Sequence, residues 1–138
     1  MKLLLLIIAA LTPFVTSVLV QPQCTGTGRG TCNANFYWNK IPVNGGYQTQ
    51  STIQLYDNTC RLIGRKSPVK EGEAVYRQLK YSVVVKNAAV TFNGDRSLGI
   101  SLNFCYAGQC ITRNQCRCET DNFPLQTAEA QCTCAFSC

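Results

Sequence analysis

Ten cysteines are the residues of this chain with the most evident chemistry. Five of them lie in the closing stretch CRCETDNFPLQTAEAQCTCAFSC, where four form two Cys-x-Cys pairs. Cysteines at this spacing either hold a metal ion as thiolates or join in disulfides, and thiolates bind metal only when reduced and deprotonated. The choice therefore depends on the compartment in which the chain folds.

The N-terminal residues MKLLLLIIAALTPFVTSVLVQ have the layout of a secretory signal peptide. Lys2 supplies a positive charge, an apolar run extends from Leu3 to Leu11, Pro13 ends it, and Ser17 offers a small residue for cleavage. The run is shorter than the roughly 20 residues that a membrane helix needs, and charged residues interrupt the rest of the chain. We predict a signal peptide at residues 1–17, no transmembrane segment and an extracellular protein.

Cleavage after Ser17 leaves residues 18–138 as a single disulfide-rich β domain, and cleavage after Ala10 or Val20 is an alternative. Because the secretory pathway oxidises thiols, we expect disulfides rather than a metal site, and no cofactor. Histidine, the commonest partner of cysteine in structural zinc sites, is absent. The predicted disulfide residues are Cys24, Cys32, Cys60, Cys105, Cys110, Cys116, Cys118, Cys132, Cys134 and Cys138.

The pairing of ten cysteines does not follow from sequence, but spacing restricts it. Two cysteines in a Cys-x-Cys pair on a strand point to the same face, and a bond between them would strain a small ring. We expect the pair at 116 and 118 to share bridges with the pair at 132 and 134. Cys105 and Cys110 are expected to close the loop CYAGQC. The three N-terminal cysteines must bond to each other or to the C-terminal cluster.

The rest of the chain is typical of antiparallel β-structure. Strand patterns occupy NANFYWNKI, a hairpin at 47–64, LKYSVVVKNAAVTF and LGISLNFCYAG, with turn signals at Asn44-Gly45-Gly46 and Asp57-Asn58. We predict a mainly β fold, an antiparallel sandwich or small barrel, with at most one or two short helices at 71–79 and 124–132. The predicted core comprises Leu98, Ile100, Leu102 and Phe104, with Val83, Val85 and either Leu79 or Tyr81 beside them.

Catalytic chemistry finds little support in this composition. Without histidine, hydrolysis by Ser-His-Asp or Cys-His pairs is excluded, as is a His-ligated catalytic zinc. The mature chain has seven carboxylates, of which four lie in or beside turn signals. No nucleophile has an adjacent base, so we predict that the protein is not an enzyme.

The mature chain carries twelve basic residues against seven acids, and the densest basic group is RLIGRKSPVK. Its cations are Arg61, Arg65, Lys66 and Lys70. They are candidate contacts for an anionic partner, or alternatively charges that protect a sheet edge from aggregation. No aromatic residue is interleaved with them, which argues against nucleic-acid binding.

The aromatic triplet Phe36-Tyr37-Trp38 is a second candidate contact region. On a strand, Phe36 and Trp38 share one face and Tyr37 takes the other. Burial of Phe36 and Trp38 is favoured because large aromatics dominate small cores, and it makes Tyr37 an exposed ring. In the opposite arrangement Trp38 is a surface platform for sugar stacking. Tyr37 and Trp38 are therefore both candidate binding residues.

The chain has a short leader, a mature part of this size, an even cysteine count and an ending dense in Cys-x-Cys pairs. In these features it resembles the cysteine-rich small secreted proteins of filamentous fungi, many of which are candidate effectors. The resemblance implies a non-enzymatic extracellular protein that acts by binding. We expect a monomer whose partner is a host or competitor protein, a glycan or an anionic surface. Two other hypotheses are a cationic antimicrobial or membrane-acting toxin, and a small glycan-binding protein or glycan hydrolase.

Overall fold

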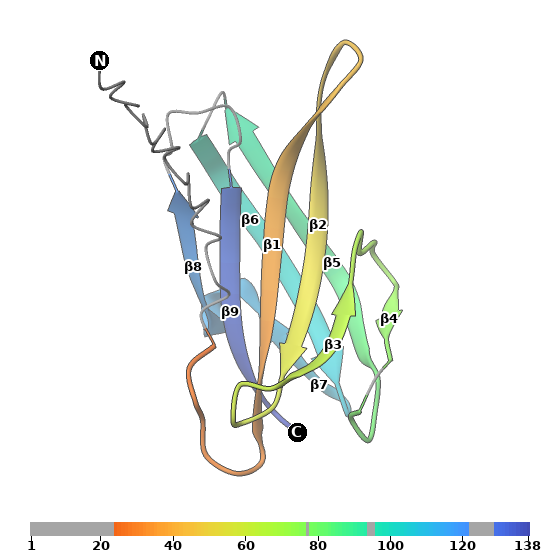
Figure 1. Ribbon diagram of the computed structural model, residues 1–138, viewed down its shortest axis with the longest axis vertical. Coiled ribbons are helices and arrows are strands. Elements are labelled where there is room, and N and C mark those ends of the chain that lie inside the picture. The colour runs from red at the N-terminus through yellow and green to blue at the C-terminus, as the bar shows by residue number, and fades with distance from the viewer. Residues whose placement is uncertain (1–23, 77, 94–95, 122–128) are drawn as a thin grey trace, which may run out of the picture.

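The computed structural model describes residues 24–76, 78–93, 96–121 and 129–138. They form two antiparallel sheets that pack face to face as a β-sandwich, which is not closed into a barrel (Figure 1). The predicted signal peptide lies outside the described residues.

The five-stranded sheet has the order β3-β2-β1-β9-β8. Its strands span Thr31–Val43 (β1), Gly46–Tyr56 (β2), Leu62–Lys66 (β3), Cys116–Asp121 (β8) and Glu129–Ser137 (β9). The C-terminal strand β9 thus inserts between β1 and β8, with Phe36 opposite Cys132 and Cys132 opposite Cys118. This arrangement brings the cysteine-rich end of the chain beside the aromatic strand.

The four-stranded sheet has the order β4-β5-β6-β7. Its strands span Ala74–Val75 (β4), Val83–Asn93 (β5), Arg96–Tyr106 (β6) and Gln109–Thr112 (β7). The β6–β7 turn consists of Ala107 and Gly108, both with positive φ, as a tight two-residue hairpin turn requires. Cys105 and Cys110, each one residue removed from the turn, face each other across the hairpin.

The core lies between the sheets and follows from period-two alternation. On β1 the fully buried side chains include Phe36 and Trp38, and on β6 they include Phe104. The ring centroids of Phe36 and Phe104 are 5.4 Å apart, and the Trp38 indole Nε1 donates a hydrogen bond to the Ala88 carbonyl of β5 at 3.1 Å. Aromatic packing therefore joins the two sheets.

Most of the predicted core is confirmed. Val83, Val85 and Phe104 are fully buried and Leu102 nearly so, while Ile100 and Leu79 are partly buried against them. Tyr81, the alternative to Leu79, is 50% exposed. The side chain of Leu98 lies outside the described part of the structure.

Neither helix candidate forms where the structure describes it, which agrees with the prediction of at most one or two short helices. Residues 71–76 and 78–79 form turns, bends and the short strand β4, because Gly72 adopts a positive φ and Val75 is drawn into the core. Residues 129–132 belong to β9, since pairing with β1 overrides the local helix propensity, and residues 124–128 lie outside the described part. Within the described residues the helical element is a single 3-10 turn, Arg113–Gln115 (η1).

All ten cysteines form disulfides, as predicted. The two C-terminal pairs cross-link as Cys116–Cys134 and Cys118–Cys132, and Cys105 bonds to Cys110. The remaining bridges are Cys24–Cys60 and Cys32–Cys138. Five disulfides indicate that the chain folds in an oxidising compartment.

Candidate functional site

The Cys-x-Cys pairs place cysteines and polar residues on opposite faces of the same two strands. Cys132 and Cys134 on β9 are fully buried in the core. Because side chains alternate along a strand, the residues between and beside the cysteines point outward. Arg117 and Glu119 of β8 consequently lie opposite Thr133 and Gln131 of β9 on the outer face of the five-stranded sheet.

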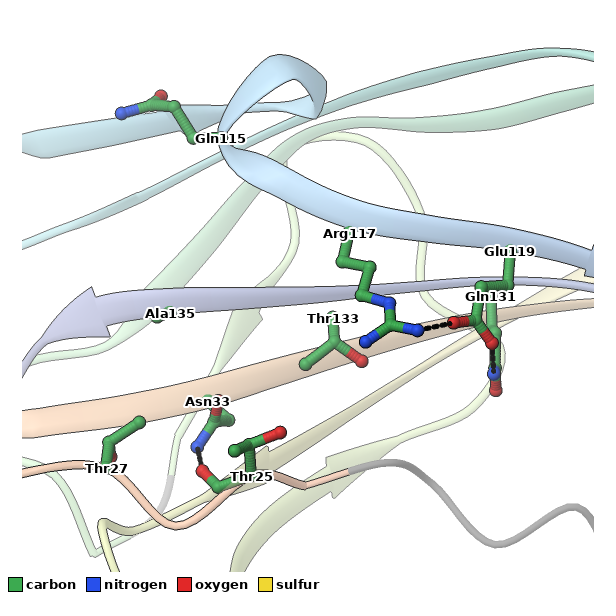
Figure 2. A pocket seen from close by; sticks show the side chains of 9 residues that line it. All are labelled: Thr25, Thr27, Asn33, Gln115, Arg117, Glu119, Gln131, Thr133 and Ala135. Carbon is green, nitrogen blue, oxygen red and sulfur yellow. Dashed lines mark hydrogen bonds and ion pairs between the residues drawn. The ribbon is translucent and has the colours of Figure 1, made fainter.

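A groove of about 270 Å³ lies on this outer face. It runs between the outward side chains of β8 and β9 and a strap formed by residues 24–30 (Figure 2). We call it the polar groove, since eight of its nine lining residues carry polar side chains. Its lining residues are Thr25, Thr27, Asn33, Gln115, Arg117, Glu119, Gln131, Thr133 and Ala135.

Covalent and hydrogen bonds hold the strap in position. Its first residue, Cys24, is bonded to Cys60 in the turn after β2. The Thr27 backbone N–H donates to the Asn58 carbonyl at 3.1 Å, and the buried Asn33 carboxamide donates to the Thr25 carbonyl at 3.1 Å. These bonds tie the strap, which forms the side of the groove opposite β8, to the five-stranded sheet.

The charges inside the polar groove neutralise each other. The Arg117 guanidinium lies 2.8 Å from one carboxylate oxygen of Glu119, and the Gln131 amide donates to the other oxygen at 3.3 Å (Figure 2). The Arg117 side chain is 78% exposed and that of Glu119 is 35% exposed. The three side chains thus form one chain of contacts that remains open to solvent.

Two poorly satisfied polar side chains lie next to the groove on β1. Asn35 is opposite Thr133 and Tyr37 is opposite Gln131. Asn35 is 1% exposed, yet neither polar atom of its carboxamide has a hydrogen-bond partner, and the Tyr37 hydroxyl also lacks one. Buried polar groups are rarely left unpaired, so this part of the sheet has spare hydrogen-bonding capacity.

Burial raises the pKa of two tyrosines, Tyr37 and Tyr56. Desolvation raises the pKa of Tyr37 to about 12, with a smaller contribution from Tyr56. The nearby Asn35 carboxamide acts in the opposite direction, although the two groups do not reach hydrogen-bond geometry. Burial also raises the pKa of Tyr56, whose hydroxyl donates to the Gln54 side chain at 2.8 Å. Both phenols are therefore neutral over the physiological range.

The predicted basic contact residues lie elsewhere, along the opposite edge of the sheet. Arg65 and Lys66 are on β3, an edge strand, and Arg61 and Lys70 flank it. Arg61 pairs with Asp57 at 3.0 Å and Lys66 pairs with Glu73 at 3.4 Å.

The carboxylates that pair with this edge are themselves held in the charged state. Hydrogen bonds from Thr59 and Arg61 lower the pKa of Asp57 to about 2, and the Lys70 backbone N–H lowers the pKa of Glu73. Charges on an edge strand discourage association with other sheets, so the position of these cations favours the edge-protection interpretation.

The aromatic triplet is divided between core and surface. Trp38 is fully buried beside Phe36, which removes it from the candidate contact residues because its ring presents no surface. The prediction that Tyr37 is an exposed ring is wrong, since the side chain is only partly exposed and its hydroxyl is buried. The cause is the neighbouring polar row on the outer face, where Asn35 and Thr52 are also buried.

None of the polar-groove residues was singled out by sequence reasoning. The signal that could have found them was present, since Arg117 and Thr133 are the middle residues of the two Cys-x-Cys pairs and must face away from the cysteines. The contributions of the strap and of Asn33 depend on the pairing of β9 with β1, which the local pattern does not reveal.

The described residues contain neither a metal-binding cluster nor a membrane-spanning helix. No group of three or more acidic or cysteine side chains there is placed to hold a metal ion. No helix in the described ranges has the length and apolarity needed to cross a membrane.

Fold and disulfides define this chain as a small, disulfide-rich antiparallel β-sandwich protein. Comparison with protein-family models, with curated proteins and with solved structures finds no match.

Proposed function

We propose that this chain is exported and acts as a non-enzymatic, effector-type binding protein that recognises a host or competitor target through the polar groove. The observation that carries the proposal is the alternation of groove residues with disulfide-bonded cysteines on β8 and β9. Two bridges beneath Arg117, Glu119, Gln131 and Thr133 restrain the strands that carry them. A rigid polar site of this kind loses little conformational entropy when it binds.

Export is supported by two independent features. The N-terminal residues have the layout of a signal peptide, and five disulfides need an oxidising compartment. Binding without catalysis is supported by the groove itself, whose single carboxylate among the nine lining residues, Glu119, is engaged by Arg117. A paired-carboxylate hydrolase needs a second carboxylate facing the first.

The first experiment tests export. Expression of the full chain in a secreting eukaryotic cell should release a mature protein that begins near Val18. Its intact mass should show all ten cysteines oxidised. Retention of the chain inside the cell with the leader uncleaved would contradict export.

The second experiment tests the groove. Fluorescently labelled oxidised protein is applied to plant, fungal and bacterial cells, and bound protein is quantified for three forms. The wild type should bind at least one cell type. The Arg117→Gln/Glu119→Gln variant, which keeps the groove neutral, should lose binding. The Arg65→Gln/Lys70→Gln variant, altered on the basic edge, should retain it. Loss of binding only in the edge variant, or no binding by the wild type, would reject the groove as the recognition site.

A further inference from the structure

The charge of the polar groove restricts the ligand that it can hold. Arg117 and Glu119 are the two charged residues among those that line it, and they lie 2.8 Å apart. Their opposite charges cancel at distances larger than this separation, so the groove offers no net attraction to a strongly charged ligand. Outside the groove, Arg61 and Lys66 are paired with Asp57 and Glu73, and surface charges are screened within about 10 Å in salt. A neutral ligand is favoured.

The groove presents hydrogen-bond donors and acceptors in balance. The guanidinium of Arg117 donates, the carboxylate of Glu119 accepts, and the carboxamide of Gln131 does both. Thr25, Thr27 and Thr133 add hydroxyl groups, of which that of Thr27 already donates to the Thr31 carbonyl at 2.7 Å. Ligands made of hydroxyl groups, each of which donates and accepts, match this pattern better than apolar molecules, for which Ala135 is the one wholly apolar lining side chain.

Size and position refine the class of ligand. A volume of about 270 Å³ lies just below the range of roughly 300–1,000 Å³ that small-molecule sites occupy, which suits a single ring of a longer ligand. The groove is open at the surface, as the exposed Arg117 shows, so the rest of such a ligand can extend into solvent. The carboxamide of Asn35 and the hydroxyl of Tyr37 are buried one strand further in and are not among the lining residues, so the ligand is held by the groove side chains alone.

We infer that the polar groove binds a neutral glycan, with one sugar ring held by the Arg117–Glu119–Gln131 chain. This inference rests on the proposed function and names its ligand class. None of the nine lining residues is aromatic, so the sugar is held by hydrogen bonds without ring stacking. Recognition by a single groove of this kind is consequently weak.

The test uses the oxidised full-length mature protein and neutral oligosaccharides built from glucose, xylose, mannose and N-acetylglucosamine. Binding is measured by calorimetry and by amide chemical shifts. At least one oligosaccharide should bind, with shifts concentrated at 116–119 and 131–135. Affinity should change little between low and high salt, because the ligand carries no charge.

Matched variants test whether the ligand binds in the polar groove. Gln131→Leu and Arg117→Gln should each weaken binding by about tenfold or more, the loss expected for a hydrogen bond that involves or supports a charged group. The control Gln48→Leu makes the same glutamine-to-leucine change at an exposed position on the β1–β2 hairpin and should leave affinity unchanged. A peptide map without reduction checks that each variant keeps the five native bridges. Arg117 is exposed, so its variant remains informative if Gln131→Leu does not fold.

Three outcomes would overturn the inference. They are the absence of binding to every neutral oligosaccharide, equal binding by the groove variants and the wild type, and salt-sensitive binding confined to sulfated or uronic-acid oligosaccharides. Binding of a polar acetylated peptide with no oligosaccharide binding would likewise reject a glycan ligand. In each case the proposed function survives if Arg117→Gln/Glu119→Gln still abolishes binding to cells, so the two failures are distinguishable.

Discussion

The two sheets of this sandwich are stabilised by different means. Four of the five disulfides lie within the five-stranded sheet and its flanking segments, while the four-stranded sheet has one, Cys105–Cys110. All ten cysteines are used in this way, so no disulfide joins one sheet to the other. Cohesion between the sheets depends on apolar packing, above all around Phe36 and Phe104.

The disulfides and the hydrophobic core therefore have different roles in this protein. The disulfides restrain the sheet that carries the polar groove, and the cysteine-free stretch from Arg61 to Phe104 supplies much of the opposing hydrophobic layer. We therefore expect reduction to affect the site and core truncation to affect the association of the sheets. Three experiments, ordered by expected effect, examine this comparison.

The largest effect is expected from the bridge that closes the longest loop. Replacing both Cys32 and Cys138 with alanine releases a loop with a sequence separation of 106 residues. The chain-entropy relation assigns about 4.7 kcal/mol to a loop of about 100 residues. Urea unfolding of the oxidised protein, followed by circular dichroism, measures the change.

The double alanine replacement of Cys105 and Cys110 is the matched control in the other sheet. Its loop has a sequence separation of 5, for which the same relation gives about 2 kcal/mol. Equal losses from the two double variants would show that loop length does not decide the contribution of these bridges.

The second effect concerns the apolar contact between the sheets. Phe104 is fully buried, and its ring lies 5.4 Å from Phe36 and 5.8 Å from Phe136. Phe104→Ala should lower the free energy of unfolding by about 3–5 kcal/mol with all disulfides intact, because it opens a cavity between the sheets. Urea unfolding measures it.

Tyr76→Ala is the control for this change. Tyr76 is 71% exposed, so its loss should stay within about 0.5 kcal/mol. If Phe104→Ala were equally mild, apolar packing around Phe104 would not be the main interaction between the two sheets.

The smallest effect is a pH dependence that reports on the outer face of the five-stranded sheet. The pKa of Tyr37 is about 12 in the folded protein against 10.0 for an unperturbed tyrosine, mainly because of burial. Its contribution to stability is complete below about pH 10 and is lost as the pH rises through about 12, since the unfolded chain releases the proton first.

Urea midpoints measured between about pH 9 and pH 12 should therefore fall with rising pH, and the fall should be shallower in Tyr37→Phe. Tyr56 is present in both proteins and contributes equally to each. Identical slopes for the two proteins would mean that Tyr37 is not buried in solution.

Local sequence patterns accounted for a large part of the fold. Alternation over LGISLNFCYAG placed Leu102 and Phe104 in the core, and the turn signals at 44–46 and 57–58 marked the ends of strands. The spacing of the cysteines also indicated that the pair at 116 and 118 bonds to the pair at 132 and 134, but not which cysteine joins which. These predictions succeeded because each depends on geometry within a few residues of the chain.

The candidate site was not predicted, and its residues show why. The basic residues Arg65 and Lys66 were conspicuous in sequence, yet they lie on an edge strand, where Lys66 is paired with Glu73. Thr25 and Asn33 were inconspicuous, yet the strap and β1 bring them to the polar groove. Charge density can be counted along a chain, whereas a groove exists only between segments that meet in space.

By itself, the sequence determined which side chains of each strand share a face and that the cysteines of a Cys-x-Cys pair reach together toward partners on another segment. Both properties follow from the period of two of an extended backbone. Only the tertiary structure decided that β9 lies between β1 and β8, and hence that Asn33 faces Arg117 and Glu119 across the groove. That choice depends on long-range packing of Phe36, Phe104 and Phe136, a balance of many weak contacts between distant residues that no short stretch of the chain encodes.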